Sequence, residues 1–273
     1  MILKDYPKIL AANDGYSTNP SGKNKIFSLL PSLNFYANVI RIVFYCWLKA
    51  KRKVYDDFNW VASSLDILRS LEKCGIQFEI KGMKNIVKDN EPVIFISNHM
   101  STLETFVLPS IIHPVKPVVF VVKKELTTYP FFGPINNARN PVVVGRKNPR
   151  EDLKIVFEEG AMKLREGKSI IIFPQRTRKA GFEEAEFNTL GIKLAKKNNV
   201  KVIPIALVTD AWANGRLVKD FGKIDPSKKV YIEMGEPIEV RDTGMKEHGQ
   251  VIDFIKSRLV NWGRTDLISN FKN

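Results

Sequence analysis

Short continuous apolar runs alternate along the chain with longer segments in which apolar residues recur every three or four positions. The first pattern is typical of strands buried on both faces of a parallel sheet, and the second is typical of amphipathic helices. The runs are rich in β-branched residues, as such strands should be. They occupy residues 92–97, 117–122, 141–144, 169–173 and 200–206, and a later strand is expected over residues 230–234.

Helical periodicity separates several of these runs and predicts helices over residues 150–166, 188–198 and 246–262. Strands that alternate with helices are typical of layered α/β domains. We therefore expect an α/β fold with a largely parallel central sheet flanked by helices. This domain should extend over residues 76–273.

The residues before this domain follow other patterns. Residues 1–24 are rich in Asn, Gly, Ser and Pro, which predicts a flexible leader. Residues 25–75 should form two helices, over 26–48 and 56–73, because apolar residues recur there at helical spacing. We expect these two helices to form an N-terminal membrane-docking segment.

That expectation rests on the first helix, which carries a polar stripe on an otherwise apolar surface and ends in a basic cluster. These features are typical of a helix lying in the interface of an anionic membrane. Packing on the protein's own core is the alternative. A true span is disfavoured, because Arg41 at the bilayer centre would cost at least about 2.5 kcal/mol. The stripe consists of Asn34, Asn38, Arg41, Tyr45, Lys49 and Arg52.

Composition narrows the set of partners. The net charge of +14 favours a polyanionic partner, which could be nucleic acid, anionic lipid or a phosphorylated small molecule. The basic residues are spread along the chain without a nucleic-acid motif, so we expect no nucleic-acid partner. The first residues lack the pattern of a signal peptide, which predicts a protein on the cytoplasmic side. Two cysteines and three scattered histidines predict neither a disulfide framework nor a metal site.

The first candidate for chemistry directly follows the run 92–97, at a strand end, where ligands bind in open α/β sheets. The imidazole of His99 can act as a general base toward a hydroxyl, and the carboxylate of Glu104 can hold the other ring nitrogen. Residues five apart do not share a face of one helix. The pair therefore requires His99 in a loop and Glu104 in the first turn of the following helix.

The same segment also fits a purely structural interpretation. Ser101 and Glu104 have the spacing of a capping box, in which Glu104 bonds back to the amide of Ser101 and marks the start of a helix. His99 would then be a loop histidine without a chemical task. Spacing alone favours this second interpretation.

A second polar segment follows the run 169–173 and places Arg176, Arg178 and Lys179 beside the end of a strand. Guanidinium groups bind phosphate bidentately, so this segment fits a phosphate clamp. A solvated basic loop is the alternative. Arg146, at the end of another strand, is also placed to meet an anion.

In order and spacing, these segments resemble the glycerolipid acyltransferase family over residues 76–240. Its Asn-His-x-x-x-x-Asp block is matched by Asn98, His99 and Glu104. A Lys-Glu-Leu…Pro-x-x-Gly…Arg pattern, a Phe-Pro-Glu-Gly-Thr-Arg pattern and an apolar strand around a proline follow in the family's order. The positions that match these later blocks are Lys124, Glu125, Leu126, Pro130, Gly133, Arg146, Phe173, Pro174, Thr177, Arg178 and Pro204.

Two positions depart from the family pattern. Glu104 stands where Asp is typical and is one methylene longer, although the lipid A acyltransferases resemble this sequence in accepting Glu there. Gln175 and Arg176 stand where Glu and Gly are typical. Gln keeps the hydrogen-bonding oxygen but loses the charge, whereas Arg removes the backbone freedom of glycine and adds charge. The second departure bears on which acceptor is recognised.

The resemblance implies transfer of a fatty acyl group from acyl-coenzyme A or acyl carrier protein to a hydroxyl of a lysophospholipid such as 1-acylglycerol-3-phosphate. It implies His99 as the general base, Glu104 as its orienting partner, and no bound metal or cofactor. The protein should be monotopic or peripheral on the cytoplasmic face of the cell membrane. A lipid A-type or aminolipid acyltransferase, or a non-catalytic basic membrane-binding protein, is the alternative. The residues expected to hold the substrate are Lys124, Arg146, Gln175, Thr177 and Arg178.

Overall fold

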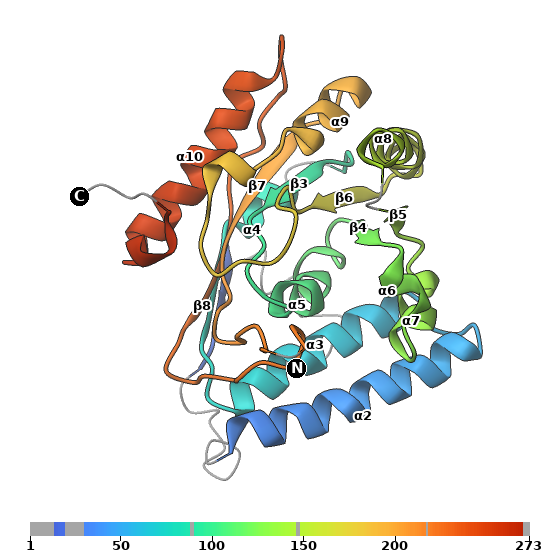
Figure 1. The fold of residues 1–273 in the computed structure, drawn as a ribbon, viewed down its shortest axis with the longest axis vertical. Coiled ribbons are helices and arrows are strands. Elements are labelled where there is room, and N and C mark those ends of the chain that lie inside the picture. Colours follow the sequence, from blue (N-terminus) through green and yellow to red (C-terminus); the bar gives the residue numbers. More distant parts are fainter. Residues whose placement is uncertain (1–13, 20–29, 88–89, 146–147, 217, 270–273) are drawn as a thin grey trace.

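A computed structural model describes residues 14–19, 30–87, 90–145, 148–216 and 218–269. These residues form an α/β fold around an eight-stranded sheet with the strand order β1-β2-β8-β7-β3-β6-β4-β5 (Figure 1). The strands are β1 (Gly15–Ser17), β2 (Phe78–Lys81), β3 (Ile94–Ser97), β4 (Val118–Lys123), β5 (Val142–Val144), β6 (Ser169–Ile172), β7 (Val202–Val208) and β8 (Val230–Met234).

The centre of the sheet is parallel, as the sequence predicted. Neighbours pair in parallel from β7 through β3, β6 and β4 to β5, and β2 also pairs in parallel with β8. Only the β1–β2 and β7–β8 pairs are antiparallel among the described strands. The carboxyl ends of β3, β4, β5 and β6 therefore meet along one edge, which is where open α/β sheets bind ligands.

Helices cover both faces of this sheet. The longer ones on one face are α2 (Pro31–Lys51), α3 (Asp57–Lys73) and α5 (Leu103–Ile112), and those on the other are α8 (Pro149–Arg165), α9 (Leu190–Asn198) and α10 (Met245–Asn261) (Figure 1). Short helices connect the elements, namely α4 (Met83–Val87), α6 (Glu125–Thr128), α7 (Phe132–Ala138), η2 (Glu184–Glu186) and η3 (Thr265–Leu267).

Burial on both faces explains why the strand runs are continuous rather than alternating. Phe95 of β3 packs in the core beneath α5, whereas Ile94 and Ile96 pack in the core beneath α8 and α9. All three side chains are at most 1% exposed. A polar residue at any of these positions would lose its hydration without gaining a partner.

Strands β1 and β2 were not predicted. β1 lies inside the stretch interpreted as a flexible leader, so that interpretation is wrong for residues 15–17. Its sequence is polar, and it is held by pairing with β2 and by hydrogen bonds of 2.6 Å from Tyr16 and Thr18 to Glu72. The rest of the predicted leader lies outside the described residues, apart from residues 14 and 18–19.

The two predicted N-terminal helices are present, with shifted bounds in the first. α2 begins at Pro31, a residue favoured in the first turn because it lacks the N–H that would remain unpaired there. It ends at Lys51 with basic residues in its last turn, where they complement the helix dipole. α3 begins after Asp56, whose side chain accepts a hydrogen bond from Asn59 N at 2.9 Å. Residues 20–29 lie outside the description.

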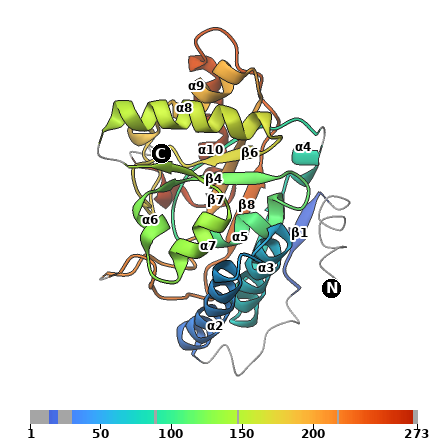
Figure 2. The same cartoon turned by 90° about the vertical axis from the view of Figure 1, so that its right-hand side faces the viewer.

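The two helices are not a separate layer with a core of its own. Phe35, Leu65 and Leu68 share one buried cluster with Phe95 and with Ile205 of β7. Packing on the protein's own core, the alternative interpretation of α2, therefore accounts for one face of this helix. Figure 2 shows α2 and α3 side by side, with α6 and α7 nearby (Figure 2).

A second face of α2 remains apolar and exposed. Leu33, Ile40 and Phe44 lie at helical spacing and are 65%, 62% and 49% exposed. The wide apolar arc seen in the sequence is thus divided between the core and the surface. Within the part of the chain that the structure describes, no helix is long and apolar enough to cross a membrane.

Candidate active site

Asn98 joins the end of β3 to the neighbouring strand β7. Its side-chain Nδ2 donates to Leu207 O, and Leu207 N donates to its Oδ1, both at 2.9 Å. The side chain is buried, so this pair of hydrogen bonds replaces water on both sides. Asn98 thereby fixes the loop in which the next residue, His99, lies.

His99 and Glu104 are in contact. Nδ1 of His99 lies 2.9 Å from Oε1 of Glu104, with His99 in the loop after β3 and Glu104 in the first turn of α5. This is the placement that a base with an orienting carboxylate requires. The helix-start interpretation also holds, because Oε1 accepts from the amides of Met100 and Ser101 at 2.7 and 2.9 Å. One carboxylate thus has the contacts that both interpretations require.

The surroundings of Glu104 fix its charge. Oε2 accepts from Ser101 Oγ at 3.0 Å and from Thr209 Oγ1 at 2.7 Å. Burial alone would raise the pKa of this fully enclosed carboxyl, but the hydrogen bonds from His99, Thr209 and Ser101 hold it below its ordinary value. Thr209 was not identified from the sequence, because it stands alone just after β7 without a motif.

The charge of Glu104 in turn sets the tautomer of His99. An ionised carboxylate can only accept hydrogen bonds, so Nδ1 must carry the proton and Nε2 of the neutral ring is a free base. The structure records no partner for Nε2 among the described residues. The ring stacks on Phe173 with centroids 4.2 Å apart, which holds its plane.

The segment after β6 wraps around the His99 loop. Oε1 of Gln175 accepts the backbone N–H of His99 at 2.6 Å, and the amide of Lys179 donates to His99 O at 3.0 Å. The Gln175 side chain is only 2% exposed. It was predicted to hold the substrate, but its recorded contact is with the backbone of His99, for which a neutral oxygen suffices.

Arg178 reaches the start of α5. Its NH1 donates to Oδ1 of Asp220 at 2.5 Å and also to the hydroxyl of Thr102. The neighbouring hydroxyl of Thr177 accepts from Lys219 Nζ at 3.0 Å. Asp220 and Lys219 belong to the loop between β7 and β8, and no sequence pattern had singled them out.

The remaining basic residues that the sequence singled out have no described contact with the His99–Glu104 side chains. Lys124 lies at the end of β4, where its amide donates to Val144 O at 2.9 Å, and its exposed side chain has no recorded contact with the His99–Glu104 pair. Arg146 lies outside the described residues. Lys179 forms ion pairs with Glu183 and Glu186, so its charge is already compensated.

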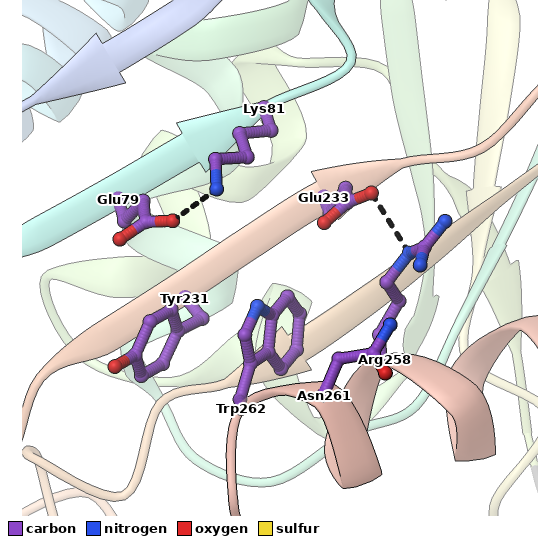
Figure 3. A pocket seen from close by; sticks show the side chains of 7 residues that line it. All are labelled: Glu79, Lys81, Tyr231, Glu233, Arg258, Asn261 and Trp262. Atoms are coloured by element: carbon purple, nitrogen blue, oxygen red, sulfur yellow. Dashed lines mark ion pairs between the residues drawn. The ribbon is translucent and has the colours of Figure 1, made fainter.

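Within the described residues, no group of His, Cys, Asp and Glu side chains is arranged to hold a metal ion. An open pocket of about 480 Å³ does exist, but it lies against β2, β8 and the end of α10 and contains none of the predicted site residues (Figure 3). Its wall includes the stacked rings of Tyr231 and Trp262 and the ion pair between Glu233 and Arg258.

Comparison with known proteins finds relatives of the segment that carries this cluster. A family model described as Acyltransferase matches residues 77–208, which include the His99–Glu104 pair and the segment after β6. A 1-acyl-sn-glycerol-3-phosphate acyltransferase of Pseudomonas aeruginosa is 32% identical over 148 residues. Over this segment the chain is similar to the glycerolipid acyltransferases.

Other members of the glycerolipid acyltransferase family extend this relationship. A 1-acyl-sn-glycerol-3-phosphate acyltransferase of Borreliella burgdorferi is 28% identical over 70% of this chain and 73% of that protein. The Pseudomonas match covers 54% of this chain and 55% of the relative, so the chain spans about half the length of that relative.

A solved structure shares the fold. The crystal structure of the 1-acyl-sn-glycerophosphate (LPA) acyltransferase PlsC from Thermotoga maritima superposes with a TM-score of 0.63. The two chains are 22% identical, and the match covers 91% of this chain and 99% of the Thermotoga chain. The α/β architecture, with its mostly parallel sheet, is thus that of this acyltransferase.

Proposed function

We propose that the protein is an O-acyltransferase that moves a fatty acyl group from an acyl thioester to a hydroxyl of a lysophospholipid such as 1-acylglycerol-3-phosphate. The observation that carries the proposal is the contact between buried, ionised Glu104 and Nδ1 of His99. It leaves Nε2 as a base, and the segment with Thr177 and Arg178, which can bind phosphate, is joined to the His99 loop by the hydrogen bond from Lys179 N to His99 O. The names of the family relatives support the choice of acceptor.

In the proposed reaction, Nε2 of His99 takes the proton of the acceptor hydroxyl as its oxygen attacks the thioester carbonyl. The C–S bond then breaks, and the imidazolium returns the proton to the leaving thiolate of coenzyme A or acyl carrier protein. Glu104 stabilises the imidazolium between these two steps. No metal or redox cofactor takes part, and no group on the protein is acylated.

The acceptor's phosphate would lie at Arg178 and Thr177. A guanidinium group supplies two parallel N–H donors to phosphate, and a threonine hydroxyl supplies a third. Lys124 and Arg146 are proposed as further cations at the same edge of the sheet, because Lys124 follows β4, the neighbour of β6, and Arg146 follows β5, the next strand along. Gln175 acts indirectly, through the backbone of His99.

The lipid acceptor would enter from a membrane on which α2 docks. Leu33, Ile40 and Phe44 form an exposed apolar stripe on this helix. Phe131 lengthens the apolar surface, since its ring lies 5.3 Å from that of Trp47 near the end of α2 and is 48% exposed. Basic residues at the end of the helix suit anionic headgroups on the cytoplasmic face of the cell membrane. They are Lys49, Lys51, Arg52 and Lys53.

Incubation of the purified protein with acyl-coenzyme A or acyl carrier protein donors and a panel of lysolipids tests the proposal. We expect diacyl product with lysophosphatidic acid, and a rate at least about 100-fold lower for His99→Ala with an unchanged melting temperature. An active His99→Ala variant would refute the assigned base. A wild type that is inactive with every donor and acceptor would leave the non-catalytic membrane-binding alternative.

One residue, Arg176, supports a second class of acceptor as an alternative. Arg176 replaces the glycine typical of the family and adds a charge beside Thr177 and Arg178. A lipid A-type or aminolipid acceptor would use the same base and a different headgroup contact. Product formation with such an acceptor, at a higher kcat/KM than with lysophosphatidic acid, would select this alternative.

A further inference from the structure

The connection between β7 and β8 is far longer than these antiparallel neighbours need. Two-residue to five-residue turns ordinarily join such strands, whereas here residues 209–229 intervene. The connection, drawn in orange in Figure 1, is folded rather than loose. Trp212 is 2% exposed and its Nε1 donates to Asp220 O at 3.1 Å, while the amide of Ala213 donates to Lys223 O at 3.0 Å.

Helix α2 holds this loop in place through hydrogen bonds. The Tyr36 hydroxyl donates to Gly222 O at 2.6 Å, and the amide of Ile224 donates to Ser32 Oγ at 3.0 Å. The loop therefore has a defined position relative to the sheet, and so do the side chains that it directs at the segment after β6.

The first of these side chains is Asp220. Its Oδ1 accepts from NH1 of Arg178 at 2.5 Å and from the hydroxyl of Thr102 at 3.0 Å. Apart from Asp220 and the Thr102 hydroxyl, both of which NH1 contacts, the structure records no partner for Arg178 among the described residues. Asp220 thus holds one corner of the guanidinium, and the edge formed by Nε and NH2 is left for a bidentate anion.

The second side chain is Lys219, adjacent in sequence. Its ammonium group lies 3.0 Å from the hydroxyl of Thr177 and has two further N–H donors. Lys219 therefore adds a second positive charge beside Thr177, whose neighbour in the sequence is Arg178. Lys179 is paired with two glutamates, whereas Arg178 is paired with one carboxylate, that of Asp220.

From this arrangement we infer that the β7–β8 loop forms the second half of the acceptor's phosphate site. Lys219 contacts the phosphate together with Arg178, and Asp220 is a positioning residue that aligns Arg178. The inference rests on the proposed function and adds to it two residues that lie outside the four sequence blocks. The exposed side chains of Val218 and Phe221 flank the pair, as suits a site that receives its ligand from a lipid surface.

The test of Lys219 uses lysophosphatidic acid and monoacylglycerol as acceptors in nonionic detergent micelles. Lys219→Ala should raise KM for lysophosphatidic acid about tenfold, the scale of one hydrogen bond to a charged group, with kcat within about twofold. KM for monoacylglycerol, which lacks the phosphate, should not change. Lys219→Arg should restore binding, and Lys223→Ala, an exposed lysine of the same loop, should behave as wild type.

The test of Asp220 separates alignment from loop stability. Asp220→Ala should raise KM for lysophosphatidic acid several-fold, and Asp220→Asn should recover part of the loss because its amide oxygen still accepts from Arg178. Asp225→Asn removes a charge from the same loop at a residue that hydrogen-bonds only Ser227 through its side chain, and should have no effect. Equal losses in Asp220→Ala and Asp220→Asn would overturn the positioning assignment.

Binding is measured separately from turnover by calorimetric titration of lysophosphatidic acid into His99→Ala protein. If lysophosphatidic acid binds in a way that depends on Lys219 but the wild type shows no turnover, acyl transfer is refuted and the phosphate site stands. If Lys219→Ala has the affinity and KM of wild type, the assignment of Lys219 to the phosphate site is wrong, and the proposed acyl transfer is unaffected. If Lys219→Ala weakens only binding to anionic vesicles, Lys219 is a membrane contact and the inference is wrong. A wild type that neither binds nor reacts refutes both.

Discussion

Thr209 donates a hydrogen bond to Oε2 of Glu104 at 2.7 Å, and it stands directly after β7, the strand next to β3. The carboxylate that orients His99 is therefore held from two neighbouring strand ends. Oε1 contacts Nδ1 of His99, and Oε2 accepts hydrogen bonds from the hydroxyls of Thr209 and Ser101. A side chain that is fixed at both oxygens can hold an imidazole in one tautomer and one orientation.

Glu104→Gln and Thr209→Val separate the orienting task of Glu104 from its helix-capping task. Gln can still reach the amides at the helix start, so Glu104→Gln should cost little stability as a cap but should lower kcat at least about 100-fold. Thr209→Val keeps the shape of the side chain and removes one donor to the carboxylate, which should cost about 1–3 kcal/mol of stability. Steady-state kinetics and urea unfolding measure the two effects. A Glu104→Gln enzyme with wild-type kcat would leave Glu104 as a helix cap only.

The lowered pKa of Glu104 predicts an acid dependence of stability. A carboxyl whose pKa is lower in the folded than in the unfolded protein stabilises the fold above its unfolded pKa, and this contribution disappears as the pH falls through the folded pKa. The difference in free energy of unfolding between wild type and Glu104→Gln should therefore be constant near neutral pH. As the pH falls below 4.5, the ordinary pKa of this carboxyl, the free energy of unfolding of wild type should decrease relative to that of Glu104→Gln.

Urea unfolding of both proteins over this pH range makes the measurement. Other carboxyls also titrate there, among them Asp210, whose pKa is lowered by Arg264 and Lys228 against the effect of its burial. They occur in both proteins and cancel in the difference. A difference that does not vary with pH would show that Glu104 is not ionised with a lowered pKa in the folded state.

The continuous apolar runs in the sequence predicted the central strands, which are buried on both faces. β3 and β6 are continuous apolar runs because helices cover them on either side. β2 was missed because only two of its four residues are apolar, and the other two, Glu79 and Lys81, are directed toward the face that bears the open pocket (Figure 3). β1 was missed because a three-residue polar strand at the edge of a sheet has no apolar pattern to detect.

The residues of the site also fall into two groups, those that the sequence indicated and those that it missed. His99, Glu104 and Arg178 lie next to buried strands in recognisable blocks, so the sequence indicated them. Thr209 and Asp220 come from the β7–β8 connection, more than 100 residues after Glu104 in the case of Thr209, and only the pairing of β7 with β3 brings them to the site. Such long-range contacts leave no local spacing in the sequence.

Gln175 provides a prediction about the altered family block. Its oxygen accepts the N–H of His99, so Gln175→Glu retains the acceptor and should keep activity within a few-fold of wild type. Gln175→Leu leaves that N–H without a partner beside a buried side chain, which should cost about 1–3 kcal/mol and displace the His99 loop. Thermal unfolding and kcat for both variants make the comparison. Equal activity of Gln175→Leu and wild type would mean that this hydrogen bond does not position His99.

The exposed stripe of α2 can be tested only by point substitutions. Deletion of the N-terminal residues through α2 would also remove Phe35, which is fully buried with its ring 4.7 Å from that of Trp212. Such a deletion would unfold the core and could not report on docking. Replacement of Leu33, Ile40 and Phe44 by Ser leaves the buried face of the helix intact.

If α2 docks on the membrane, this triple variant should bind anionic vesicles at least about tenfold more weakly, because each apolar side chain contributes on the order of 1 kcal/mol when it enters lipid. Co-sedimentation with vesicles measures the binding, and the melting temperature should be unchanged. The matched control replaces three exposed apolar residues on α8 and α10, across the sheet from α2, and should bind as wild type. These residues are Leu153, Met162 and Met245. Equal loss in both triple variants would assign vesicle binding to overall surface hydrophobicity, and no loss in either would leave charge alone as its cause.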